Sequence, residues 1–173
     1  MNDNILVAYA SKYGSTAEIA RAVGGEIQST GQKVDIRPIE EVQELQEYTA
    51  VVLGSAVYAG QWRKEAGEFL LENEGELAER PVWFFSSGPT GEGDPSELMG
   101  GWKFPDNLQP AAERIQPREI QFFHGVLDES KLGFAEKLIV KALKAPLGDY
   151  RDWDAVRAWA QEIARELEKQ SAH

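Results

Sequence analysis

The sequence predicts an α/β protein built on a doubly wound parallel sheet. Short apolar segments alternate with amphipathic segments along the chain, and several apolar segments are continuous, such as Val51-Val52-Leu53. Alternating strands and helices indicate βαβ units, and continuous apolar strands are typical of a parallel sheet that helices cover on both faces. The five expected strands are Ile5–Ala10, Val34–Ile39, Ala50–Ala56, Val82–Ser86 and Ile120–Leu127.

The helices are expected where apolar residues recur at spacings of three and four. Gly75 is expected to break the second helix, and Pro105 suits the first turn of the third. Asp152 is the expected N-cap of the last helix. The connection Glu40–Tyr48 has room for one or two helical turns. The expected helices are 16–29, 63–79, Pro105–Ile115 and 153–169.

Composition narrows the classes of function. A chain of 173 residues is expected to form one domain, 1–173, and the absence of cysteine excludes disulfides, iron–sulfur clusters and thiol catalysis. The net charge of −11 argues against nucleic-acid binding. No metal-ligand spacing and no catalytic acid, base or nucleophile stands out. Without a signal segment or an apolar run of about 20 residues, the protein is expected to be cytoplasmic.

Three segments after strands are candidate binding loops, because ligands of doubly wound sheets lie beyond the carboxyl ends of the strands. They are Ser11–Thr16, Ser55–Trp62 and Ser86–Gly93, and all three are rich in small and hydroxyl residues. The first lies at a helix start, where unpaired N–H groups and the helix dipole favour a phosphate. It matches neither the P-loop nor the G-x-G-x-x-G pattern. Alternatively, Ser11 or Ser15 only caps the helix.

These loops resemble those of the flavodoxin family. The family's [ST]-x-[ST]-G-x-T phosphate loop fits at Ser11, Gly14 and Thr16, with Tyr13 in place of the middle hydroxyl residue. The segment Leu53-Gly54-Ser55-Ala56-Val57-Tyr58 fits the family's Leu-Gly-x-x-x-aromatic pattern. The resemblance covers essentially the whole chain. It implies a flavodoxin-like five-stranded parallel sheet of order 2-1-3-4-5, with strands numbered along the chain and helices on both faces.

Within this family the details are most similar to the quinone-dependent protoporphyrinogen oxidases. The similar segments are Gly54–Arg63, an extra helical segment at about 128–148, and the stretch that begins Asp152-Trp153-Asp154. This resemblance implies an FMN-dependent oxidoreductase that oxidises a porphyrinogen, with a quinone as acceptor. One alternative is a soluble one-electron carrier between redox partner proteins. Another is a binding module that kept the fold and lost the flavin.

The flavodoxin resemblance also implies the residues that hold FMN without a covalent bond. Tyr58 is expected to stack on the flavin ring. Ala59 follows it where many flavodoxins have a glycine, and Trp62 or Trp102 could supply a second stacking ring. The expected phosphate loop is Ser11, Lys12, Tyr13, Gly14, Ser15 and Thr16, the first flavin wall is Ala56, Val57 and Tyr58, and the second is Ser86, Ser87, Gly88, Pro89, Thr90 and Gly91.

Residues 131–144 are locally basic within this acidic chain. They form an amphipathic helical pattern in which Lys137, Lys141 and Lys144 share a face and Glu136 is the lone acid. Such a helix can dock on an anionic membrane or an acidic partner. We therefore hypothesise a peripheral contact with the inner face of a membrane. The alternative is a helix that covers the hydrophobic core and leaves its lysines in solvent.

Overall fold

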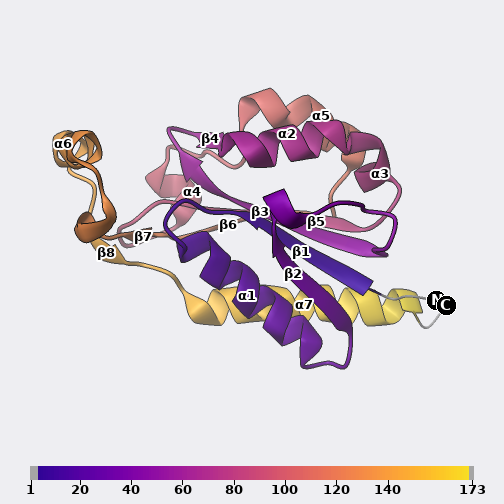
Figure 1. Ribbon diagram of the computed structural model, residues 1–173. Helices are drawn as coiled ribbons and strands as arrows, with labels where there is room; N and C mark the ends of the chain where they lie inside the picture. Colours follow the sequence, from indigo (N-terminus) through magenta and orange to yellow (C-terminus); the bar gives the residue numbers. More distant parts are fainter. Residues whose placement is uncertain (1–3, 172–173) are drawn as a thin grey trace.

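A computed structural model describes residues 4–171 and has a central parallel sheet between two layers of helices (Figure 1). The parallel strands lie in the order β2-β1-β3-β5-β6, which confirms the predicted order of the five main strands. A sixth strand, β4 (Gln61–Trp62), pairs antiparallel with β3 and was not predicted. The main strands are β1 (Asn4–Ala10), β2 (Lys33–Pro38), β3 (Ala50–Tyr58), β5 (Val82–Ser87) and β6 (Glu119–Phe123).

Helices cover both faces of this sheet because successive side chains of a strand point to opposite faces. Ile5 and Val7 of β1 pack into one hydrophobic cluster with α1 and α7, whereas Leu6 and Ala8 pack into the other with α2, α3 and α5. Figure 1 shows these two layers on opposite sides of the sheet. The covering helices are α1 (Ser15–Gln28), α2 (Lys64–Glu72), α3 (Glu74–Ala78), α5 (Gln109–Ile115) and α7 (Trp153–Ser171).

Two helix boundaries differ from the prediction, one near Gly75 and one near Pro105. The break between α2 and α3 falls at Asn73, whose side-chain amide donates to the carbonyl of Phe69 at 2.8 Å, and Gly75 lies inside α3. Pro105 precedes a 3-10 turn, η2 (Asp106–Leu108), rather than α5 itself. Asp152 does act as an N-cap, because its carboxylate accepts the N–H of Ala155 at 3.0 Å.

Short elements complete the connections. The predicted turn after β2 is the 3-10 helix η1 (Ile39–Glu41), and a short helix, α4 (Pro95–Leu98), follows the third candidate loop. Asp94 caps α4 by accepting the N–H groups of Ser96 and Glu97.

The last predicted strand is split in two. The strand β6 ends at Phe123, and after Gly125 the strand β7 (Val126–Leu127) pairs antiparallel with β8 (Gly148–Asp149). Residues 126–149, which we call the arm, leave the sheet at its carboxyl edge and return through this pairing. The arm also holds η3 (Glu129–Lys131) and α6 (Phe134–Leu143). None of the helices within residues 4–171 is long and apolar enough to cross a membrane.

Gly54 gives a direct test of the sheet packing. The Phe85 side chain of β5 lies where a Cβ at Gly54 would be, so Gly54→Ala forces a buried aromatic ring to move. We expect this substitution to lower the free energy of unfolding by about 2 to 3 kcal/mol. The control is Gly75→Ala, because no atom lies within 4 Å of a Cβ there, and alanine should stabilise α3 by about 0.5 kcal/mol. Urea unfolding measures the free energy of unfolding of both variants, and equal values for the two would contradict this packing.

Candidate functional site

The three candidate loops begin at the same edge of the sheet. Ala10 is in register with Ser55, and Ser55 is in register with Ser86. Because the three strands are parallel neighbours, the segments that follow them emerge side by side. The loops that the sequence singled out are therefore together in space.

The first loop leaves the start of α1 open. Gly14 is the N-cap residue, in a left-handed conformation with φ of 90°, and no side chain caps the helix. Ser11 Oγ instead accepts the N–H of Gly14 at 3.0 Å, and Ser15 is the first residue of α1. The alternative that Ser11 or Ser15 serves as a helix cap is therefore wrong. Helix geometry leaves the first N–H groups of α1 without intrahelical partners, so this end can receive an anion.

Thr16 ties the first loop to the third. Its side chain is fully buried, and its hydroxyl lies 2.8 Å from the hydroxyl of Ser87. This hydrogen bond connects the start of α1 to the end of β5 beneath the loops. Thr16 therefore fixes the distance between the first and third loops. Its hydroxyl is already hydrogen-bonded to Ser87.

The second loop is a tight hairpin between β3 and β4. Ala59 and Gly60 form its two-residue turn, both with positive φ, of 50° and 75°. The left-handed conformation costs about 1 kcal/mol for a residue with a side chain, so Ala59 stores local strain where many flavodoxins have glycine. Ala56 and Val57 are buried, whereas Tyr58 is 44% exposed at the rim of the hairpin.

Two tryptophans hold this hairpin in place, and burial excludes Trp62 as a second stacking ring. Trp62 is buried against Phe84 and Phe104 and donates its indole N–H to Ser86 Oγ at 2.8 Å. The indole N–H of Trp102 binds the carbonyl of Gly60 at 3.1 Å. Ser86 thus contributes its hydroxyl to the core of the fold.

The third loop is held by close backbone contacts. A Cβ at Gly88 would lie 3.2 Å from the carbonyl oxygen of Val57, so a larger residue would press on the second loop. The N–H of Gly88 binds the carbonyl of Phe123, and the carbonyl of Pro89 accepts the N–H of Gly125 at 2.9 Å. The end of β6 thereby positions the loop.

The remaining part of the third loop approaches the arm. Thr90 is partly exposed, and Gly91 has a φ of 112° that favours glycine. A Cβ at Gly91 would lie 3.4 Å from the ring of Pro146. The third loop therefore lies against the returning segment of the arm.

The other end of the arm rests on the first loop. Lys12 and Tyr13 both bind the carboxylate of Glu136 on α6, the lysine at 3.0 Å. Lys131 donates to the carbonyl of Tyr13 at 3.4 Å. Partial burial and then the nearby Tyr13 raise the pKa of Tyr58, whose electrostatic neighbours also include Lys12 and Glu136. All three loops and the arm thus meet in one region.

Arg151 supports this region and was not singled out from the sequence. Only 8% of its side chain is exposed; it donates to the carbonyl of Ser15 at 3.2 Å and pairs with Asp149 at 2.8 Å. The hydrogen bond from Arg151 holds the pKa of Asp149 below its usual range. A small cavity beside the first loop is lined by Arg151 and Lys131 among others. Glu18 and Asp128 line the same cavity, and Glu18 lies 3.6 Å from Arg151, so charges of both signs lie next to the open start of α1.

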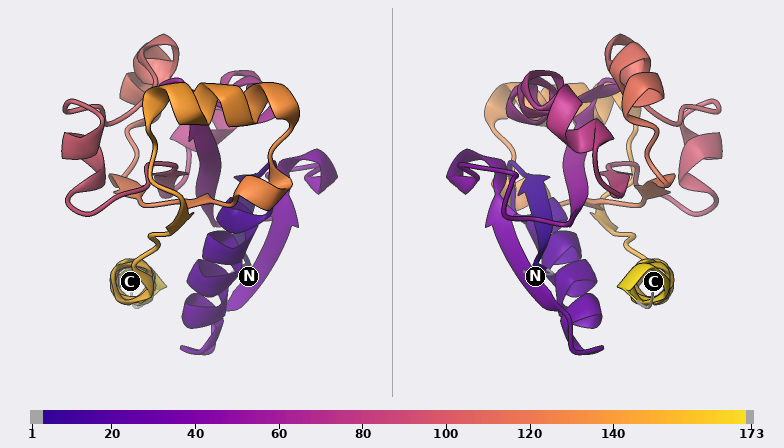
Figure 2. Two further views of the ribbon diagram at one scale, coloured as in Figure 1. Left: turned by 90° about the vertical axis from the view of Figure 1, so that its left-hand side faces the viewer. Right: turned by 90° about the vertical axis from the view of Figure 1, so that its right-hand side faces the viewer.

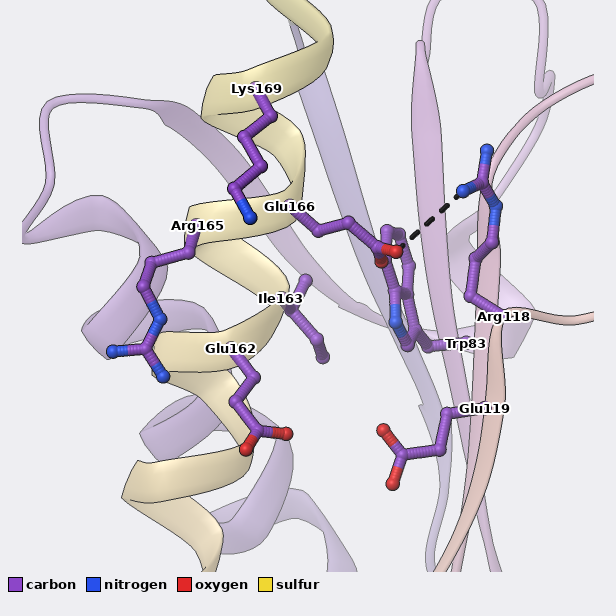
Figure 3. A pocket seen from close by; sticks show the side chains of 8 residues that line it. All are labelled: Trp83, Arg118, Glu119, Glu162, Ile163, Arg165, Glu166 and Lys169. Atoms are coloured by element: carbon purple, nitrogen blue, oxygen red, sulfur yellow. Dashed lines mark ion pairs between the residues drawn. The ribbon is translucent and has the colours of Figure 1, made fainter.

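A second hollow lies away from the loops. It is bounded by α7 and the amino ends of β5 and β6, with Trp83 at its base and an ion pair of 3.6 Å between Arg118 and Glu166 (Figure 3). Ligands of doubly wound sheets bind at the opposite, carboxyl edge. We therefore place the candidate site at the three loops.

The contact between Glu136 and the first loop predicts a pH-dependent arm. Hydrogen bonds from Tyr13 and then Lys12 lower the pKa of Glu136. A carboxylate with a lowered folded-state pKa contributes stability above its ordinary pKa, and this contribution is lost as pH falls through the lowered value. We expect hydrogen-exchange protection of α6, corrected for intrinsic rates, to fall as pH drops below 4.5.

Glu136→Gln should expose α6 to exchange already at neutral pH and abolish this pH dependence. The control Glu129→Gln removes a carboxylate from the same arm without touching the contact. Equal exchange of α6 in the two variants at every pH would contradict this role of Glu136.

Comparisons with known proteins agree with the fold. Protoporphyrinogen IX dehydrogenase [quinone] of Escherichia coli (strain K12) is 23% identical over 95% of this chain and 96% of its own length. An archaeal flavodoxin superposes with a TM-score of 0.63 at 15% identity, over 95% of this chain and 99% of that one.

A larger protein shares the fold as well. The rubredoxin oxygen:oxidoreductase of Desulfovibrio gigas superposes with a TM-score of 0.64 at 15% identity, over 99% of this chain but only 37% of that one. The model of the flavodoxin domain family matches residues 6–154. With its sheet order, its three loops and this match, the chain belongs to the flavodoxin domain family.

Proposed function

We propose that this protein binds FMN across the three loops and acts as an FMN-dependent oxidoreductase. One observation carries the proposal: the uncapped start of α1 opens at the same sheet edge as the half-exposed ring of Tyr58. An anionic group and a flat apolar ring of one ligand need these two features together. Membership of the flavodoxin family supports a flavin as that ligand.

The residues at the loops fit such a ligand. The open N–H groups of α1 and the hydroxyl of Ser15 would hold the phosphate. Tyr58 would pack against one face of the ring, and the backbone from Gly88 to Gly91 would form the opposite side. When bound, FMN supplies the redox chemistry, while the protein orients the ring and excludes water.

The finer proposal is the oxidation of a porphyrinogen with a quinone as electron acceptor. The similarity to the Escherichia coli dehydrogenase extends over almost the whole chain, including the arm, which supports this choice. The substrate would lose electrons and protons, and the quinone would take them up. An alternative is a one-electron carrier that docks basic proteins, and the net charge of −11 favours it.

FMN binding is tested by changing the first loop. In the double variant Gly14→Val/Thr16→Ala, a branched side chain meets the left-handed conformation of Gly14 and the Thr16–Ser87 hydrogen bond is lost. We expect FMN affinity, measured by calorimetry, to fall about 100-fold, because the loop that orients the N–H groups of α1 toward the phosphate loses its shape. The control is Gly25→Val, in the same helix with open space around it. Unchanged affinity in the double variant would remove the phosphate assignment.

Enzyme and carrier are separated by two assays on the FMN-loaded protein. The oxidoreductase should oxidise protoporphyrinogen when a soluble quinone is present, and turnover should stop without the quinone. A carrier should show no such turnover, and stepwise reduction should reveal two well-separated one-electron steps. Turnover that is independent of the quinone would contradict the proposed acceptor.

A further inference from the structure

A groove lies between α2 and the connection from β2 to β3. This connection has no α-helix, and only η1 gives it regular structure, so a hollow of about 320 Å³ is left beside α2. Ile39, Leu45 and Phe69 are buried at its apolar floor. Arg80 holds the connection by donating to the carbonyls of Leu45 and Tyr48. The groove is therefore fixed by the fold.

The rim of this groove is acidic, and we call it the acidic groove. Glu65 pairs with Arg63, and Glu68 lies 3.6 Å from the exposed Lys64, whereas the other two carboxylates form no ion pair within residues 4–171. Residues 39–79 contain ten glutamates and two basic residues, so −8 of the net charge of −11 falls in this segment. The glutamates that line the groove are Glu40, Glu65, Glu68 and Glu72.

The helix α6 presents the opposite chemistry. No residue of α6 is buried, so the alternative that it covers the hydrophobic core is wrong. Glu136 binds the first loop, and the opposite side of the helix therefore points away from the protein. That side, which we call the outer face, consists of four exposed residues: Phe134, Lys137, Leu138 and Lys141.

The outer face is locally basic although the arm has no net charge. Residues 126–149 contain four lysines and four acids. Asp128, Glu129 and Asp149 lie in the segments that join α6 to the sheet, and Glu136 pairs with the first loop. The two lysines of the outer face form no ion pair with any residue that the structure describes.

The outer face and the groove side of α2 share one spacing. Glu65, Glu68, Phe69 and Glu72 are at positions i, i+3, i+4 and i+7 of α2, and the outer face has the same spacing in α6. At i+3 and i+7 the outer face has lysines where α2 has glutamates, separated by one helical turn of about 6 Å in both helices. Both helices have an apolar residue at i+4. The two surfaces therefore match in charge and in spacing.

The outer face cannot meet the acidic groove of its own chain. The contact of Glu136 with the first loop turns the outer face away from the body of the protein. Figure 1 shows α6 at the end farthest from the termini, apart from the helix layer that contains α2, and Figure 2 (left) shows it running across this end in front of the other elements. A second molecule brings the same groove.

We propose that the outer face of α6 docks in the acidic groove of a second copy of this chain. Lys137 and Lys141 pair with Glu68 and Glu72 of the second copy, while Leu138 covers the apolar floor. The net charge of −11 repels the copies in other orientations. Because the two surfaces differ, each copy keeps one of them free, and the assembly continues into a ring or a chain. This contact goes beyond the proposed function and needs no bound flavin.

The test is sedimentation equilibrium of the full-length chain over a series of protein concentrations, where the weight-average mass should rise beyond that of a monomer. The helix variant, Lys137→Glu/Lys141→Glu, and the groove variant, Glu68→Lys/Glu72→Lys, should each stay monomeric, because like charges then meet. All four positions are exposed, so both variants should fold. An equimolar mixture of the two should regain association, because each variant supplies the charge that the other requires.

The control is Lys33→Glu/Lys169→Glu, which changes the net charge as the helix variant does, at exposed positions of β2 and α7. It should associate like the unmodified protein, and loss of its association would overturn the proposal. A monomer at every concentration would also overturn it, and a membrane as the partner of α6 would give that result together with binding to phosphatidylglycerol vesicles. Failure of the mixture to associate would overturn it as well. None of these results depends on whether FMN binds.

Discussion

The parallel pairing of β3 with β1 on one side and β5 on the other is the constraint on which the site depends. All of β3 except its last residue is buried, so the strand cannot shift by one position without turning apolar side chains to the wrong face. The register Ala10–Ser55–Ser86 then places three loop starts at one edge. Gly54, beneath Phe85, shows how closely this part of the sheet is packed.

The fold and the common edge of the three loops could be predicted because both follow from the alternation of strands and helices. Continuous apolar segments such as Val51-Val52-Leu53 predict buried parallel strands, and alternation with helices predicts the doubly wound order. The strand order was predicted from the resemblance to flavodoxins. The structure has this order, and the domain match confirms the resemblance. The roles of individual residues toward FMN stay predictions.

Contacts between segments that are distant in the sequence could not be predicted from local sequence patterns. The hairpin at Ala59 and Gly60 lacks the Asn-Gly signal of such turns, and the fixed positions of Trp62 and Trp102 depend on partners from other strands and loops. Arg151 is one of many charged residues in the sequence. Only the return of the arm through β8 places it against the carbonyl of Ser15.

The pairing of β7 with β8 has a consequence for the history and the engineering of this protein. Because Leu127 faces Gly148, the excursion between them starts and finishes at neighbouring points of the backbone. A short turn could join these points, so a flavodoxin body could gain or lose the whole excursion without any change in its strand order. The excursion is thus a self-contained module, and surface chemistry can be grafted onto the fold or removed from it in one step.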